Sequence, residues 1–150
     1  MQVKYNLRLL KMIGFRKIFL LLIILAGIDI MVYSNPQGIP EGISLAFKAG
    51  NSVELAKYFN SNIELVVLQN EDLYSKIQAE RILKDFFKTY PPKKFTILHH
   101  GGKEDSKYSI AELVTDNTTF RVYFLLKTRE GKLLIHQLRI EKEHELKNPE

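Results

Sequence analysis

Residues 118–141, TTFRVYFLLKTREGKLLIHQLRIE, decide how this chain folds. Consecutive side chains of a strand point to opposite sides, so the first half of the stretch has two faces. One face holds Phe120, Val122, Phe124 and Leu126, and the other holds Arg121, Tyr123, Leu125 and Lys127. Glu130-Gly131 has the chemistry of a tight turn. The stretch therefore predicts two antiparallel strands, 118–128 and 132–141.

Both faces of this predicted hairpin are partly apolar. In the second strand, strict alternation places Leu134, His136, Leu138 and Ile140 on one face and Leu133, Ile135, Gln137, Arg139 and Glu141 on the other. One face must pack against helices. We expect the other, carrying Tyr123, Leu125, Leu133 and Ile135, to be covered by a second copy of the chain, as a homodimer, or by edge residues of the longest helix.

The rest of the pattern predicts an α+β fold. Strands 95–100 and 108–115 join the hairpin in a four-stranded antiparallel meander, with turns at Gly101-Gly102 and Asp116-Asn117. A long helix is expected from the cap Ser75 to Thr89, and a strand over 63–68. Two short helices are expected to meet at Gly50. The first begins at Pro40, and the second carries apolar residues as far as Phe59. Strands of this length twist, so the sheet is expected to curve around the long helix as a cone.

The N-terminus has the layout of a targeting segment. Five basic residues precede the apolar run Ile18–Ile28, and residues 32–34 resemble a cleavage site. We interpret residues 1–34 as an export signal, starting at Met1 or Met12, that delivers the domain to the periplasm or cell exterior. The alternatives are an uncleaved membrane anchor through residues 18–33, which is short for a span, and a buried helix. Residues 35–39 are then a linker, 40–142 the domain and 143–150 a polar tail.

Charge and cysteine content exclude several classes of function. The chain has a formal net charge of +5, with 22 Lys and Arg against 17 Asp and Glu. Residues 1–34 hold five of those basic residues and one acidic residue, which leaves 17 against 16 in the rest and no footprint for nucleic acid. The absence of cysteine excludes disulfides, thiolate metal sites and a cysteine nucleophile.

A family resemblance covers roughly residues 38–142. It rests on Ala49-Gly-Asn51, Tyr58-Phe59, Ile63-Glu-Leu65, Tyr74-Ser75, Phe86-Phe87, Phe95 with His99 and Gly101, Tyr108 with Ile110, Phe120-Arg-Val-Tyr-Phe124 and Leu138-Arg-Ile-Glu141. In these residues the chain resembles an exported bacterial family known only as domain of unknown function 4783, and the arrangement resembles the nuclear-transport-factor-2-like (NTF2-like, cystatin-like) cone. The resemblance implies a fold but not an activity, because that superfamily mixes isomerases, dehydratases and cyclases with non-catalytic binding and dimerising modules.

Histidines are the first candidate site residues. His136 lies among apolar neighbours and is either a pocket base inside the cone or a hydrogen-bonded core residue. His99 is expected to share a face with Phe95 and Ile97, where it is either a hydrogen-bonded residue at the edge of the core or a pocket base. His100 is expected to face the opposite side. No spacing of ligands on one element supports a metal site, and no cofactor is expected.

Arg121, Tyr123 and Arg139 form a second candidate set, because their alternation places both guanidinium groups on one face. They can bind an anion, or pair across strands with Glu112 or Glu141. The leading hypothesis is a non-catalytic exported domain that binds a protein partner or a small apolar ligand through the cone pocket or the sheet face. The rival is a small isomerase- or cyclase-like enzyme that uses His136 with Tyr108 or Tyr123.

Overall fold

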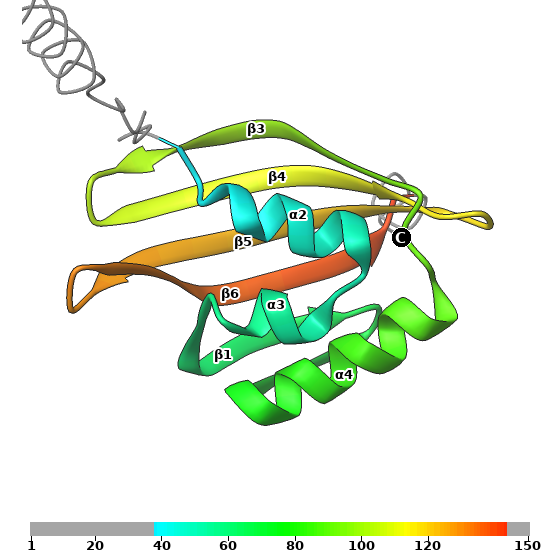
Figure 1. The fold of residues 1–150 in the computed structure, drawn as a ribbon, viewed down its shortest axis with the longest axis horizontal. Coiled ribbons are helices and arrows are strands. Elements are labelled where there is room, and N and C mark those ends of the chain that lie inside the picture. The colour runs from blue at the N-terminus through cyan, green and yellow to red at the C-terminus, as the bar shows by residue number, and fades with distance from the viewer. Residues whose placement is uncertain (1–37, 144–150) are drawn as a thin grey trace, which may run out of the picture. The chain divides into compact units, whose positions relative to one another are not determined.

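The computed structural model describes residues 38–143. Predictions for residues 1–34, for most of the linker and for the tail after residue 143 lie outside them. The described elements follow in chain order (Figure 1): α2 (Glu41–Ala49), α3 (Ser52–Ala56), β1 (Phe59–Val67), β2 (Asn70–Ser75), α4 (Lys76–Thr89), β3 (Lys94–Lys103), β4 (Ser106–Val114), β5 (Thr119–Arg129) and β6 (Lys132–Lys142). The predicted α+β fold is confirmed.

The strands form one six-stranded sheet in the order β2-β1-β6-β5-β4-β3. The predicted antiparallel meander of β3, β4, β5 and β6 is confirmed, but its first turn lies at Glu104-Asp105 and not at Gly101-Gly102, which pair within the β3–β4 ladder. The sheet as a whole is mixed, because β1 pairs with β6 in the parallel direction. Strand β2 was not predicted, since its residues are mostly exposed and polar and it forms by antiparallel pairing with β1.

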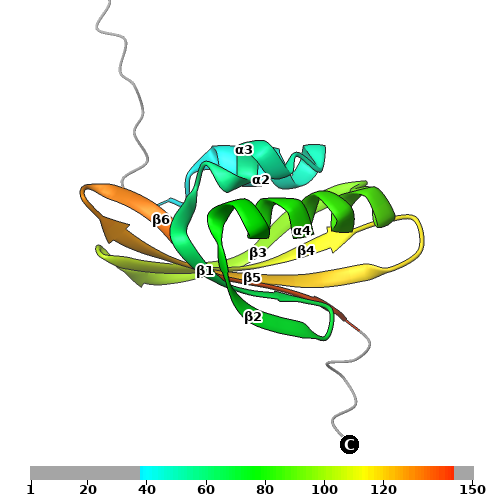
Figure 2. The ribbon, with the colours of Figure 1, turned by 90° about the horizontal axis from the view of Figure 1, so that it is seen from below.

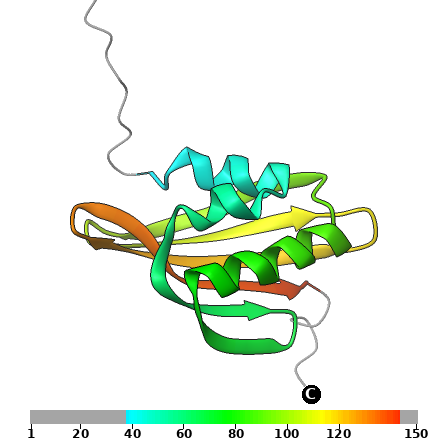
Figure 3. The same ribbon diagram turned by 60° about the horizontal axis from the view of Figure 1, so that its bottom comes forward.

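The helices cover a single face of the sheet, as Figure 2 and Figure 3 show. Helix α4 starts at the predicted cap, where Ser75 and Gln78 form a complete capping box. Its buried side chains are Ala79, Leu83, Phe86 and Phe87, and Ile82 and Tyr90 pack against the same core. The predicted helix from the cap Ser75 to Thr89 is therefore present, and it packs through one apolar face.

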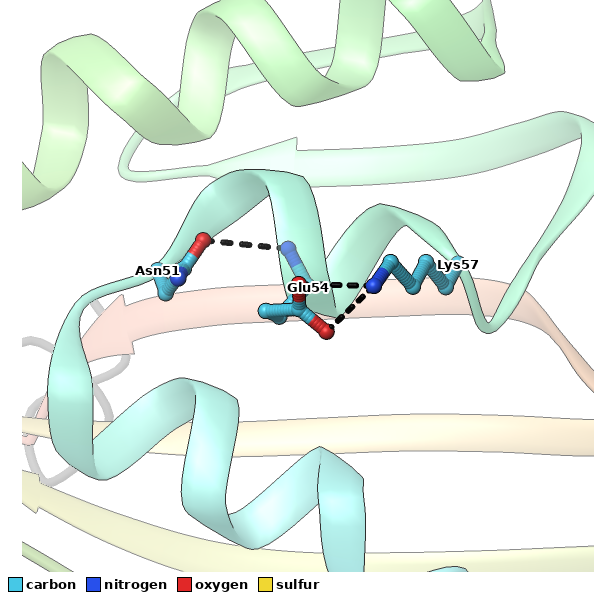
Figure 4. Close-up of polar contacts among 3 residues, drawn as sticks. All are labelled: Asn51, Glu54 and Lys57. Atoms are coloured by element: carbon cyan, nitrogen blue, oxygen red, sulfur yellow. Dashed lines mark hydrogen bonds and ion pairs between the residues drawn. The ribbon is translucent and has the colours of Figure 1, made fainter.

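Helices α2 and α3 meet at Gly50, whose φ of 61° is the left-handed conformation that suits glycine. Pro40 precedes the helix as its cap residue instead of being its first residue. Helix α3 is capped by Asn51, whose Oδ1 atom accepts a hydrogen bond from the Glu54 N–H at 3.0 Å (Figure 4). It ends at Ala56, so Phe59 begins β1 and does not extend a helical face.

An aromatic cluster fills the space between helices and sheet. Phe47 of α2 stacks on Phe95 with ring centroids 4.5 Å apart and lies 6.3 Å from Phe124. Phe86 of α4 meets Phe120 edge-on at 5.1 Å. Because these rings occupy the centre of the helix-covered face, the core holds the sheet against the helices by apolar packing.

Two β-bulges change which side chains face the core. Leu125 lies opposite Gln137 but Leu126 lies opposite Ile135, so His136 is an extra residue in β6. The alternation expected for residues 132–136 is therefore wrong: Ile135 is fully buried and Leu133 packs against the core, so neither belongs to the exposed face.

The second bulge lies in β3. Ile97 pairs with Ala111 but His99 pairs with Ile110, which makes Leu98 the extra residue. His99 therefore leaves the face of Phe95 and Ile97, and it is exposed. The prediction that His99 shares the face of Phe95 and Ile97 is therefore wrong. A β-bulge is the reason, as it is for the wrong face predicted for Ile135.

Candidate functional site

None of the helices described in residues 38–143 lies on the other face of the sheet (Figure 2). Residues directly opposite each other in neighbouring strands point to the same side, so the register defines this open face. Its central members, from β2 to β4, are Leu73, Glu64, Val66, Gln137, Arg139, Tyr123, Leu125, Tyr108 and Ile110. Leu73 is 66% exposed and Tyr108 40% exposed, although both are large apolar or aromatic side chains.

The open face brings together most of the predicted site residues. One row across the sheet runs from His99 through Ile110 and Tyr123 to Arg139. Tyr108 lies in the next row, and Arg121 in the row on the other side. These residues therefore share an external surface and do not line the interior of the cone.

Tyr108 and Tyr123 form an aromatic pair on this face. Their ring centroids are 6.5 Å apart and the planes meet at 26°. The Tyr108 side chain also lies over its cross-strand partner Gly101, where an added Cβ would lie 2.8 Å from the Tyr108 hydroxyl oxygen and 2.9 Å from two ring carbons. Glycine at this position lets the ring lie flat on the sheet, which presents the ring face outward.

Arg139 is held by carboxylates on both sides. Its Nη2 atom lies 3.3 Å from Oε1 of Glu141, and its Nη1 atom lies 3.7 Å from Oε1 of Glu71. The hydrogen bond to Glu141 raises the pKa of Arg139, and the negative charges of Glu141, Glu71 and Glu64 act in the same direction. The pairing with Glu141 was predicted, but it runs along β6 and not across strands. Arg139 is thus neutralised locally, which disfavours the anion-binding reading.

Its neighbours complete a polar network on the open face. Gln137 donates a hydrogen bond through Nε2 to Oε1 of Glu64 at 2.6 Å. Arg121 lies between Glu112 and Glu141 in the register and is exposed. This alternation of acid and base is the usual arrangement of a solvated sheet surface.

His136 is held in the bulge and not in a catalytic pair. Its Nε2 atom is buried and has no hydrogen-bond partner in the part of the chain that the structure describes. Burial lowers the pKa of His136, and the nearby positive charges of Lys127 and Arg129 lower it further. His136 is therefore neutral near pH 7, and its Nε2 atom neither donates nor accepts a hydrogen bond within residues 38–143.

A groove also opens at the edge of the helix-covered side, between α2 and β3. It has a volume of about 550 Å³ and is lined by Ser44, Lys48, Lys93, Lys94, Phe95, Thr96 and Ile97. Lys93 Nζ lies 3.3 Å from Oδ2 of Asp116, an exposed pair of little energetic weight. Sequence reasoning missed the groove, and the doublet Lys93-Lys94 was its only signal.

Neither a membrane span nor a metal centre is found in residues 38–143. No helix there is long and apolar enough to cross a bilayer. The same residues contain no group of three or more histidine, aspartate or glutamate side chains placed to hold a metal ion.

Comparisons with known proteins agree with this geometry. A crystal structure from Bacteroides ovatus, of a DUF4783 family protein, is 37% identical, with a TM-score of 0.67 over 71% of this chain and 96% of that one. The corresponding protein from Bacteroides uniformis is 35% identical, with a TM-score of 0.67 over 70% and 97%. A designed NTF2 protein is 14% identical with a TM-score of 0.54 over 67% and 90%, which shows the fold alone.

No curated protein matches the chain. The family described as Domain of unknown function (DUF4783) matches residues 40–141, which is nearly the whole of the described domain. The predicted resemblance is thus confirmed, and with it the curved NTF2-like sheet. The chain belongs to the DUF4783 family.

Proposed function

We propose that this domain is a non-catalytic binding module that acts outside the cytoplasm and docks through its open face on a second copy of the chain. The observation that carries the proposal is the exposure of large side chains on a face that no described helix covers. Leu73, on the edge strand β2, and Tyr108, on β4, are the most exposed of them, and Ile110, Tyr123 and Leu125 are half-buried beside Tyr108. Tyr108, Ile110, Tyr123 and Leu125 adjoin one another on β4 and β5, and an apolar cluster bordered by polar side chains is typical of a protein interface.

The chemistry of the face supports binding more than catalysis. Rigid aromatic side chains such as Tyr108 and Tyr123 supply contact area at a low cost in conformational entropy. The polar side chains next to this cluster, Glu64, Gln137 and Arg139, already make hydrogen bonds within one copy. A histidine enzyme would need an oriented acid–base pair, and Nε2 of His136 has no such partner.

Export is the second part of the proposal, and it rests on the sequence before the domain. The basic residues and the apolar run Ile18–Ile28 fit a cleavable signal. Mass spectrometry of the native protein should find an N-terminus near Asn35. Recovery of the chain with residues 1–34 intact in the membrane fraction would contradict cleavage and show that this segment is a membrane anchor.

Light scattering on residues 35–150 tests the docking face. This segment can be studied alone, because the crystallised relatives consist almost entirely of the matching region. The wild-type segment should give twice the monomer mass, and Tyr123→Glu should give a monomer. Leu45→Glu is the matched control: Leu45 is 55% exposed on α2, on the helix side. A wild-type monomer at high concentration would overturn the proposal.

A further inference from the structure

Strand β3 is one of the two edges of the sheet. It pairs with β4 on one side, and among the described residues no strand lies on its other side. Figure 1 shows it as the outermost strand beside α2. An edge strand presents a row of main-chain N–H and C=O groups on its outer side, which another extended chain can pair with. The outer side of β3 is therefore a place where a strand can be added.

The groove between α2 and β3 follows this edge. Its α2 wall is formed by Ser44 and Lys48, one turn apart, and its strand wall by the five consecutive residues 93–97. Successive side chains of a strand point to opposite faces, so a groove over one face would be lined by alternate residues only. The unbroken run indicates that the groove opens along the side of the strand, where the main chain is accessible.

The groove has the size and regularity that a short extended segment needs. Its volume of about 550 Å³ lies within the roughly 300–1,000 Å³ of known ligand sites. The β-bulge at Leu98 comes directly after the groove, so residues 94–97 keep a regular register with β4. A peptide that adds a strand to an edge gains affinity from main-chain hydrogen bonds and specificity from the surfaces beside the edge. Helix α2 supplies such a surface.

Positive charge determines which kind of segment fits. Three lysines line the groove, Lys48, Lys93 and Lys94, and no acidic residue lines it. Lys93 pairs with Asp116, whereas Lys48 and Lys94 have no ion pair within residues 38–143. Lysine on an edge strand disfavours pairing with a chain that cannot balance its charge. Carboxylates on an incoming strand balance it, so the edge discriminates in favour of acidic segments.

We infer that the groove binds an extended acidic peptide segment, which adds to the outer side of β3 as a further strand and places carboxylates beside Lys48 and Lys94. This site lies along an edge of the sheet and uses none of the apolar cluster of the open face. The inference therefore goes beyond the proposed dimer and does not depend on it.

Binding of a synthetic peptide to residues 35–150 tests the site. The probe is a short fluorescein-labelled peptide of alternating glutamate and valine, and fluorescence anisotropy measures its dissociation constant. Lys48→Glu and Lys94→Glu should each weaken binding by roughly tenfold at low salt, and by less at high salt, where exposed charges are screened. Lys84→Glu is the matched control: Lys84 is exposed on α4, outside the groove, and its reversal should leave binding unchanged.

Methylated peptides separate strand addition from charge attraction alone. The N–H groups of a strand point alternately to its two sides, so methylation of every second amide nitrogen removes the donors of one side and keeps all carboxylates. Of the two peptides methylated in alternate registers, one should lose binding and the other should keep most of it. Equal affinities of the two would overturn strand addition. No binding of the unmodified acidic peptide at millimolar concentration, or equal binding of a lysine–valine peptide, would overturn the site itself.

The variant Tyr123→Glu separates this inference from the dimer proposal. It should bind the acidic peptide as the wild type does, because Tyr123 lies on the open face and not in the groove. Loss of peptide binding in this variant would place the site on the open face and overturn the inference. A wild-type monomer that binds the peptide would overturn the dimer and support the groove.

Discussion

Leu126 of β5 lies opposite Ile135 of β6, one residue out of step with the pairing of Leu125 and Gln137. The shift leaves His136 as the extra residue of a bulge, with a buried Nε2 atom and no hydrogen-bond partner. A bulge is the device by which a long strand bends and re-aims its side chains. It explains how β6 curves around the helices while both its ends remain paired with β5.

Acid should destabilise the fold through His136. Because burial and two neighbouring cations hold the pKa of His136 below 6.5 in the folded protein, the unfolded chain binds more protons as pH falls through that value. The free energy of unfolding should therefore decrease below about pH 6.5, and His136→Gln should reduce this dependence. Urea denaturation at several pH values measures both. His100→Gln is the control, because His100 is exposed. An equal effect of the two substitutions on the pH dependence of the free energy of unfolding would contradict the prediction.

The two glycines at hairpin ends should differ in their tolerance of alanine. Gly102 has a φ of 116°, and a Cβ there would meet backbone, with Lys107 Cα at 2.8 Å. Gly131 has a φ of 73° but open space around it. Gly131→Ala should therefore cost about 1 kcal/mol of stability from backbone strain alone, and Gly102→Ala clearly more. Thermal denaturation compares the two, and an equal loss would count against a steric role for Gly102.

Periodicity and caps were enough to predict most of the fold. Regular alternation in residues 119–127 gave the correct core face of β5, and Ser75 gave the correct start of α4. Such signals are local, so they can be read from one segment. The sequence also grouped Arg121, Tyr123 and Arg139 correctly on one face.

The failures have a physical reason in common, which is that they depend on pairing between distant segments. A bulge shows only in the register against the neighbouring strand, so the positions of His99 and His136 could not be predicted by counting residues. Strand β2 likewise has little apolar pattern of its own and exists by pairing with β1. The parallel contact of β1 with β6 joins segments some 70 residues apart in sequence, beyond the reach of local patterns.

Removal of the α3 cap should destabilise the domain measurably. Asn51 satisfies the N–H of Glu54, a group that has no partner within the helix (Figure 4). Asn51→Ala should lower the free energy of unfolding by about 1 kcal/mol. Lys57→Ala removes the neighbouring exposed ion pair with Glu54 and should cost only about 0.5 kcal/mol or less. Chemical denaturation of both variants checks this order, and the reverse order would show that the cap contributes little.

Phe47 should be the side chain of α2 on which the domain depends most. It is fully buried, stacks on Phe95 of β3 and meets Phe87 of α4 edge-on at 6.0 Å, so one ring joins both helices to the sheet. Phe47→Ala should cost about 3–5 kcal/mol because it leaves a cavity among rigid neighbours.

Phe47→Leu keeps part of the side-chain volume and remains measurable if Phe47→Ala fails to fold. Its loss of stability should lie between those of the wild type and Phe47→Ala. Leu45→Ala, on the exposed side of α2, is the control and should change stability by roughly 0.5 kcal/mol or less. Urea denaturation monitored by circular dichroism gives all three values. Similar losses for Phe47→Ala and Leu45→Ala would mean that α2 does not hold the sheet, because a helix that packs through one face cannot be equally sensitive on both.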